Sequence, residues 1–176
     1  VYGCAIKCYI EQFPFGFEST KQAVMSIDKN EFQVLAICHN RDEVAHGIWQ
    51  IALEKEHYHF LIRSSKSKKR FRISEILDML HIYFRPGIDD ILLLNHGIES
   101  IVNFQNYSVY LTHETPKAIQ DNKELYGIEE IFSNLSLDEI KRVREGYLRV
   151  TEALKKPTMS ELAKLDTEAF NLGYEL

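Results

Sequence analysis

The chain has 176 residues, of which 45% are hydrophobic, and a formal net charge of −5. This is enough sequence for one ordinary globular domain with a small addition, and the acidic balance argues against a general nucleic-acid-binding protein, which is usually basic. No apolar run is long enough to cross a bilayer and no signal peptide opens the chain, so we expect no membrane partner. The three cysteines have no CxxC spacing, which favours reduced thiols in a cytoplasmic protein.

The first third of the chain predicts three strands and a helix. Residues 1–12 are rich in β-branched and aromatic side chains, which favour a first strand. Ser19 stands three residues before Gln22, the spacing of a capping box, so we expect a helix over residues 19–30. Residues 31–38 predict a second strand that ends just before His39, and residues 47–63 contain a third strand whose clearest part is 57–62.

The middle of the chain predicts two more helices with a short strand between them. Residues 73–84 carry apolar side chains at helical spacing, residues 89–95 form an apolar run typical of a buried strand, and residues 98–113 favour a helix. The resulting order is strand–helix–strand–strand–helix–strand–helix. It predicts an α+β fold with a central antiparallel sheet and helices on one side of it.

From about Asn134 the sequence becomes charged and helical. Ser136 with Glu139 and Thr158 with Glu161 both have capping-box spacing, and residues 158–165 weakly resemble the start of a helix-turn-helix. We therefore predict two parts, a domain over residues 1–133 and a helical segment over residues 134–176. Because the sequence begins at Val1 and ends within the pattern NLGYEL, we expect it to belong to a longer protein.

The stretch EKEHYHFLIR (54–63) places two histidines around a tyrosine in the third strand. Alternate residues of a strand face the same way, so His57 and His59 should point to one face and Tyr58 to the other. Two such histidines are often only hydrogen-bonded residues of a core or surface. His39 and Asp42, just after the second strand, favour a metal site instead, because neutral imidazoles and a carboxylate suit Mn²⁺, Mg²⁺ or Zn²⁺ with open positions.

Further along the chain, Tyr107, Tyr110 and His113 follow one another at steps of three and would share a face of the predicted helix. A tyrosine near a divalent cation can attack a polarised phosphodiester and form a phosphotyrosine bond. Such tyrosines are also common as core residues of amphipathic helices. His81 falls between the apolar positions of its helix, and we expect it to be packed.

The segment SSKSKKRFR (64–72) holds five basic residues and no acid. Such a loop is either a solvated connection or a site that contacts phosphates through its local positive potential. The basic residues that would contact DNA are Lys66, Lys68, Lys69, Arg70 and Arg72.

The segments HNRD (39–42), HYH (57–59) and VYLTHET (109–115) occur in this order over about residues 30–126. In this the chain resembles the replication initiators of rolling-circle plasmids from Gram-positive bacteria, a branch of the HUH endonuclease superfamily. The resemblance implies that Tyr110 is the nucleophile and that a divalent metal ion, Mn²⁺ or Mg²⁺, is held by four ligands: His39, Asp42, His57 and His59. It also implies a ferredoxin-like antiparallel sheet of about five strands, with the tyrosine on an adjoining helix and a C-terminal helical region for oligomerisation.

The activity that the resemblance implies is metal-dependent nicking and rejoining of single-stranded DNA at a plasmid origin, through a 5′-phosphotyrosine intermediate. The expected partner is origin DNA, as a duplex binding site and a single-stranded nick site, with a second copy of the chain and a host helicase as further candidates. Candidates for the acceptor of the Tyr110 proton are His113, Glu114 and water. Three alternatives stay open: a relaxase or transposase with the same chemistry, a non-catalytic DNA-binding regulator, and a metallo-hydrolase acting on a small substrate.

Overall fold

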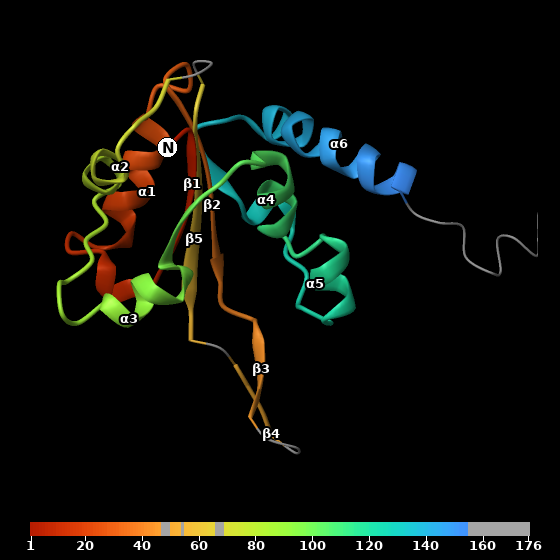
Figure 1. Ribbon diagram of the computed structural model, residues 1–176, viewed down its shortest axis with the longest axis horizontal. Coiled ribbons are helices and arrows are strands. Elements are labelled where there is room, and N and C mark those ends of the chain that lie inside the picture. Colours follow the sequence, from red (N-terminus) through yellow and green to blue (C-terminus); the bar gives the residue numbers. More distant parts are fainter. Residues whose placement is uncertain (47–49, 54, 66–68, 155–176) are drawn as a thin grey trace, which may run out of the picture.

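The computed structural model describes residues 1–46, 50–53, 55–65 and 69–154. At its centre lies a five-stranded sheet in the order β6–β1–β5–β2–β7, in which every neighbouring pair is antiparallel (Figure 1). Its strands are β1 Gly3–Cys8, β2 Phe32–His39, β5 His57–Ser64, β6 Ile98–Ser100 and β7 Phe132–Ser133. The α+β class and the antiparallel central sheet of five strands are confirmed.

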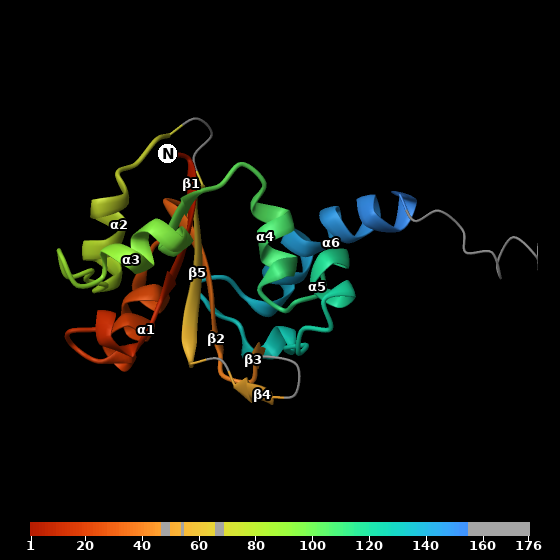
Figure 2. The ribbon, with the colours of Figure 1, turned by 60° about the horizontal axis from the view of Figure 1, so that its bottom comes forward.

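Helices lie on both sides of this sheet (Figures 1 and 2). On one side are α1 Phe17–Ser26, α2 Ile73–Leu80 and the short α3 Asp90–Leu92; on the other are α4 Phe104–Tyr110, α5 Pro116–Gln120 and α6 Leu137–Leu154. The prediction of helices on one side only is therefore wrong. The sequence did indicate a sheet that is covered on both faces. Residues 34–37 and 60–62 are uninterrupted apolar runs, whereas a strand with one solvent-exposed face alternates apolar and polar residues.

The two faces of the sheet form two separate hydrophobic clusters. Val34, Ala36 and Phe60 point toward α1 and α2 and are buried there together with residues of β1. Leu35 and Leu61, one residue along on the same strands, point the other way and pack with residues of α4 and α6. This alternation follows from the two-residue period of the strand, and it decides which side chains reach each layer of helices.

A two-stranded hairpin of β3 Glu43–His46 and β4 Gln50–Leu53 projects beyond the ends of β2 and β5 (Figure 1). The sequence reasoning did not predict this hairpin. Its place in the chain, between β2 and β5, explains how two adjacent antiparallel strands are joined without a helix.

Two predicted elements in the middle of the chain are wrong. Residues 89–95 are not a strand but the helical turn α3 followed by a π-helical turn, Leu93–Gly97. The Asp89 carboxylate accepts hydrogen bonds from the backbone N–H of Arg85 (2.6 Å) and from its guanidinium (2.9 and 3.0 Å), which ties the start of this turn. The single helix expected over residues 98–113 is split into β6 and α4, because Asn103 caps α4 by accepting a 3.0 Å hydrogen bond from the Asn106 backbone.

The ends of α1 and α2 also differ from the prediction. α1 begins at Phe17, after Gly16 with φ +79°, so Ser19 lies inside the helix and is not its cap. α2 ends at Leu80 because His81 takes a left-handed conformation with φ +57°. His81 is exposed and its Nδ1 lies 2.8 Å from the Ser19 hydroxyl, so the expectation that His81 is packed is wrong.

The C-terminal helix α6 begins as predicted. Ser136 and Glu139 form the capping box: the Ser136 N–H donates to the Glu139 carboxylate (2.8 Å) and the Glu139 N–H donates to Ser136 Oγ (3.3 Å). Ile140 joins the hydrophobic cluster on the α4 side of the sheet. The predicted capping pair Thr158 and Glu161 and the segment 158–165 lie outside the described residues. Within the described part of the chain, no helix is long and apolar enough to cross a membrane.

Candidate metal and tyrosine site

Three histidines converge at one end of the central sheet. Because β2 and β5 are antiparallel neighbours, His39 lies directly opposite His57, and His59 follows on the same face. The ring centroids are 5.3 Å apart for His39 and His57, 4.8 Å for His39 and His59, and 5.0 Å for His57 and His59. Tyr58 points to the opposite face, where its ring contacts Phe13 with centroids 5.0 Å apart. The predicted facing of these residues is confirmed.

Asp42 joins this cluster from the turn that follows β2. One of its carboxylate oxygens, Oδ2, lies 3.6 Å from His39 Nδ1 and 3.8 Å from His57 Nε2. Its other oxygen, Oδ1, accepts a 2.9 Å hydrogen bond from the Tyr126 hydroxyl. That hydroxyl in turn accepts a 2.9 Å hydrogen bond from the Arg41 backbone, so the carboxylate is held in one orientation. The structure thus brings together His39, Asp42, His57 and His59, the four predicted ligands.

The hydrogen bonds of two histidines indicate which ring nitrogens carry protons. His39 Nε2 lies 2.8 Å from the Leu111 carbonyl, and His57 Nδ1 lies 3.0 Å from the Lys55 carbonyl. A carbonyl can only accept, so each of these nitrogens carries the proton and the other nitrogen of a neutral ring presents a lone pair. His39 Nδ1 is buried without a hydrogen-bond partner in the described residues. Two lone pairs and a carboxylate oxygen therefore face one another, an arrangement that a cation would complete.

Burial keeps His39 and His59 neutral near pH 7. Desolvation lowers the pKa of His39 to about 4, although the hydrogen bond to the Leu111 carbonyl and the charge of Asp42 oppose this shift. Desolvation also lowers the pKa of His59 well below the ordinary value, assisted by the neighbouring histidines. The neutral imidazole is the form that binds metal ions, so the environment already selects the ligand form.

His113 belongs to the same cluster, which the sequence reasoning missed. Its ring centroid is 4.4 Å from that of His39, and its Nδ1 donates to the Glu124 carbonyl (2.7 Å) while lying 3.7 Å from Asp42 Oδ1. The predicted helix would have placed His113 on the face of Tyr110. Instead α4 ends at Tyr110 and His113 takes a left-handed conformation, with φ +58°, that turns its buried side chain toward Asp42. His39, Asp42 and His113 together could hold a metal ion.

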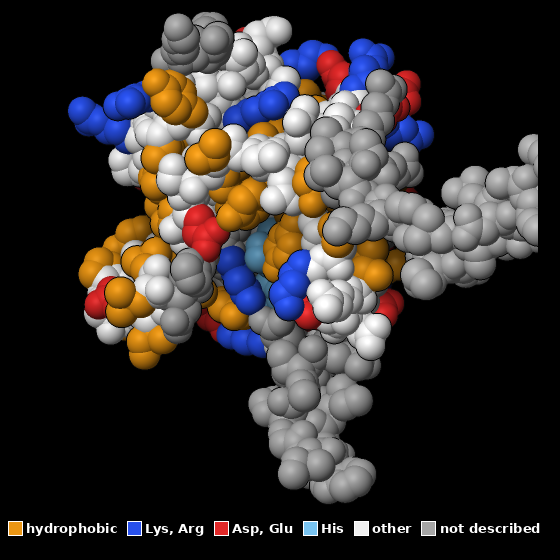
Figure 3. All heavy atoms as spheres, turned by 45° about the vertical axis from the view of Figure 1, so that its right-hand side comes forward, with side chains coloured by type: hydrophobic (Ala, Val, Ile, Leu, Met, Phe, Trp, Pro, Cys, Tyr) orange, Lys and Arg blue, Asp and Glu red, His pale blue; other side chains and the backbone are white. Residues whose placement is uncertain are grey.

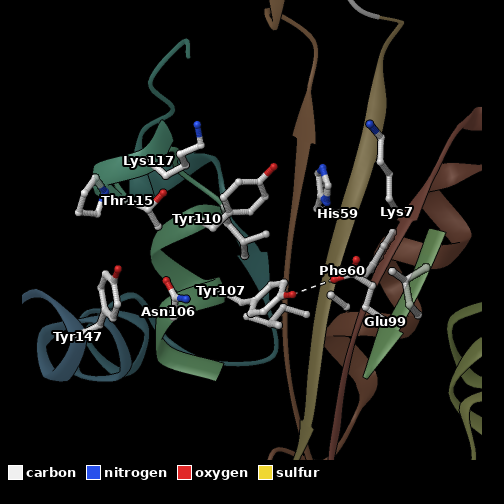
Figure 4. A pocket seen from close by; sticks show the side chains of 15 residues that line it. Lys7, His59, Phe60, Glu99, Asn106, Tyr107, Tyr110, Thr115, Lys117 and Tyr147 are labelled. Carbon is white, nitrogen blue, oxygen red and sulfur yellow. Dashed lines mark hydrogen bonds between the residues drawn. The ribbon is translucent and has the colours of Figure 1, made fainter. Parts of the chain in front are cut away.

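Tyr110, the predicted nucleophile, lies at the edge of this cluster. Its ring centroid is 6.1 Å from that of His59 and 5.6 Å from that of His113. The ring is only partly buried, and in Figure 4 its hydroxyl points away from α4 toward the space in front of His59. The Lys123 ammonium lies 3.5 Å from the Tyr110 hydroxyl, which places a positive charge beside the phenol oxygen.

The segment after Tyr110 is fixed by α6. Arg144 is buried, donates a 2.6 Å hydrogen bond to Thr112 Oγ1 and forms an ion pair with Glu114. Glu114, one of the three candidates for the acceptor of the Tyr110 proton, is therefore engaged by Arg144 in this structure. The ion pair connects the C-terminal helix directly to the residues that follow the predicted nucleophile.

A cleft of about 600 Å³ opens in front of Tyr110. His59 and Lys7 line it from the sheet, and Tyr107, Tyr110 and Lys117 line it from α4 and α5 (Figure 4). Figure 3 shows a histidine side chain at the bottom of a hollow in the surface, with lysine or arginine side chains on either side. The positive side chains give this cleft the charge that an anionic ligand requires.

The predicted basic segment comes after β5 in the chain. It follows Ser64, at the end of β5 opposite to His57, and the rise along this strand separates the two ends by roughly 20 Å. Lys69, Arg70 and Arg72 are exposed, Arg70 lies over the Tyr2 ring at 5.2 Å, and Lys69 lies 3.9 Å from a Glu31 carboxylate oxygen. Lys66 and Lys68 lie outside the described residues. The structure therefore does not bring Lys69, Arg70 or Arg72 to the metal cluster.

No protein-family model matches this chain, and no curated protein is significantly similar to it in sequence.

Proposed function

We propose that this protein is a metal-dependent enzyme that nicks and rejoins single-stranded DNA through Tyr110, as the replication initiator of a rolling-circle plasmid. One observation carries the proposal: a partly exposed tyrosine lies beside a buried histidine–aspartate cluster and faces a cleft with positive side chains. The motif resemblance over residues 39–115 and the α+β fold agree with this reading. The same chemistry serves relaxases and transposases, from which the plasmid initiator differs in the DNA that it recognises.

The proposed metal is Mn²⁺ or Mg²⁺, held by His39, Asp42, His57 and His59, with His113 as a further donor. These residues fit a cation because the neutral rings and the carboxylate oriented by Tyr126 point lone pairs at one another. When bound, the cation would withdraw charge from a phosphate oxygen and make the phosphorus more electrophilic. Mixed nitrogen and oxygen donors with open positions suit this role better than a closed structural zinc site does.

In the proposed reaction, the Tyr110 phenol oxygen attacks the scissile phosphorus. A bond forms between phosphorus and the tyrosine oxygen as the phenol gives up its proton, and the bond from phosphorus to the 3′ oxygen breaks. The 3′ oxygen takes up a proton, and the resulting 3′-hydroxyl can prime synthesis. The protein stays on the 5′ phosphate, and the reverse reaction joins the ends. Lys123, 3.5 Å from the phenol oxygen, adds positive charge where the anionic phosphate has to lie.

The test is a denaturing gel of the chain incubated with Mn²⁺ and pooled single-stranded oligonucleotides from plasmid origins. We expect a covalent protein–DNA adduct on the 5′ side of the nick, which disappears with a chelator and in Tyr110→Phe. Tyr107→Phe, one helical turn earlier on α4, is the matched control and should retain the adduct. Cleavage by Tyr110→Phe would disprove the assigned nucleophile, and DNA binding without an adduct under any metal would favour the regulator.

A further inference from the structure

The cleft in front of Tyr110 continues past the tyrosine, away from the metal cluster. In Figure 4, His59, Lys7 and Glu99 lie on one side of Tyr110, whereas Asn106, Thr115 and Tyr147 lie on the other. On the second side, Asn106 and Tyr147 lie outside the motif segments. We call the second part, lined by Asn106, Thr115, Lys117 and Tyr147, the α6 side of the cleft.

The α6 side of the cleft exists because α6 packs closely on α4. Gly146 of α6 faces Gln105 of α4, and a Cβ atom at Gly146 would lie 2.9 Å from Gln105 Nε2. Ile140 and Arg144, about two turns and one turn before Tyr147 on α6, anchor the helix in the hydrophobic cluster and in the ion pair with Glu114. This packing brings the Tyr147 ring to the cleft.

The side chains of the α6 side combine an aromatic ring, an amide and a cation. The partly exposed ring of Tyr147 offers a flat apolar surface. Asn106 offers both a donor and an acceptor, and its carboxamide makes no hydrogen bond to another described residue. The exposed Lys117 ammonium, 2.8 Å from an Asp121 carboxylate oxygen, lies at the rim. Stacking surface, base-edge partners and positive charge are the three features with which proteins hold single-stranded nucleic acid.

We infer that the α6 side of the cleft binds one base of the DNA strand next to the scissile phosphate and sets a sequence preference at that position. The inference rests on the proposed function, because it places the phosphate at Tyr110. The base stacks on Tyr147, the Asn106 carboxamide hydrogen-bonds to the base edge, and Lys117 contacts a phosphate of the strand. A cleft of about 600 Å³ is large enough for a nucleotide beside the tyrosine.

The experiment measures the binding of four fluorescent homotetranucleotides, of deoxyadenylate, deoxycytidylate, deoxyguanylate and deoxythymidylate, by anisotropy. The full chain is used with a chelator, so that binding does not depend on the metal site. We expect the wild type to prefer one of the four. Tyr147→Ala should weaken binding of all four by roughly 5- to 100-fold, whereas Tyr147→Phe, which keeps the stacking ring, should bind like the wild type.

Asn106→Ala should reduce the differences among the four tetranucleotides, because it removes the group that reads the base edge. Tyr83→Ala is the matched control, since Tyr83 is also exposed but lies after α2 on the other side of the sheet. Circular dichroism shows whether each variant is folded.

Two results would overturn the inference: no binding of any tetranucleotide by the wild type, or unchanged binding in folded Tyr147→Ala and Asn106→Ala. Either result leaves the proposed nicking activity standing if the covalent adduct forms. Conversely, binding that depends on Tyr147 and Asn106 supports the base site even where no adduct is found, in which case only the proposed activity fails.

Discussion

The two faces of the central sheet use the same strands for different purposes. On the face toward α1 and α2, β2 and β5 contribute buried apolar residues in their middle parts, including Phe60. On the face toward α4, the same strands carry Leu35, Ile37 and Leu61 in their middle and the three histidines of the cluster at one end. Neighbouring residues of one strand thus stabilise the core on one face and form a polar cluster on the other. Less apolar surface is buried where the histidines lie.

Substitutions at Phe60 and His59 give the largest expected difference between the two faces, because these residues are adjacent in β5 and point to opposite faces. Phe60 is 1% exposed, and its ring lies against Phe13 and Phe132. Phe60→Ala should lower the free energy of unfolding by about 3–5 kcal/mol, since it leaves a cavity. His59→Ala should lower the free energy of unfolding of the metal-free protein by no more than about 1 kcal/mol, because the variant removes a partly exposed neutral ring.

Urea denaturation of the two variants in the presence of a chelator measures both values. Equal losses would contradict the division of labour between the faces. A loss above about 3 kcal/mol for His59→Ala would show that the histidine packs as a core residue.

The second prediction concerns metal binding, which should stabilise the protein through residues on the α4 side of the sheet. Mn²⁺ at one hundred times its dissociation constant should raise the free energy of unfolding of the wild type by about 2.7 kcal/mol. Asp42→Asn should lose most of this gain, because it removes the carboxylate charge that faces His39 and His57. Tyr126→Phe, which removes the hydroxyl that donates to Asp42 and accepts from the Arg41 backbone, should weaken metal binding by about 10- to 100-fold.

Asp78→Asn is the control for these variants, since Asp78 is an exposed carboxylate of α2 on the opposite side of the sheet. Thermal unfolding with and without Mn²⁺ gives the comparison. If Asp42→Asn responds to Mn²⁺ like Asp78→Asn and the wild type, the cluster is not the metal site.

The smallest expected effect concerns Asp89. This carboxylate stabilises the fold on the α2 side of the sheet, whereas Asp42 belongs to the candidate metal site. Hydrogen bonds from Arg85 lower the pKa of Asp89 to about 2, below its ordinary value of 3.8. The stabilisation is therefore present above about pH 4 and is lost as the pH falls through 2. Because Arg85 is partly exposed, we expect roughly 1 kcal/mol.

Urea midpoints of the wild type and Asp89→Asn at several pH values check this prediction. The wild type should be the more stable protein at pH 7, and the difference should shrink as the pH falls from 4 toward 2. A difference that stays constant over this range would mean that the loss has a cause other than ionisation.

Local sequence patterns predicted the elements whose signals are contained in a few residues. The alternation in residues 57–62 correctly separated His57 and His59 from Tyr58, and the Ser136–Glu139 spacing correctly marked the start of α6. The same approach failed at residues 89–95. An apolar run there suggested a strand, but the pairing of Asp89 with Arg85 favours a helical turn and leaves Ile91 and Leu94 exposed.

The sequence by itself determined which side chains of β2 and β5 face the site. Because side chains alternate along a strand and the two strands pair antiparallel, His39, His57 and His59 have to lie on one face. The entry of His113 and the place of Tyr147 were decided only by the tertiary structure. His113 reaches Asp42 because α4 ends early in a left-handed turn, and Tyr147 reaches the cleft because Ile140 and Arg144 hold α6 against the α4 side of the sheet. Both depend on contacts between residues far apart in the chain, which no local pattern encodes.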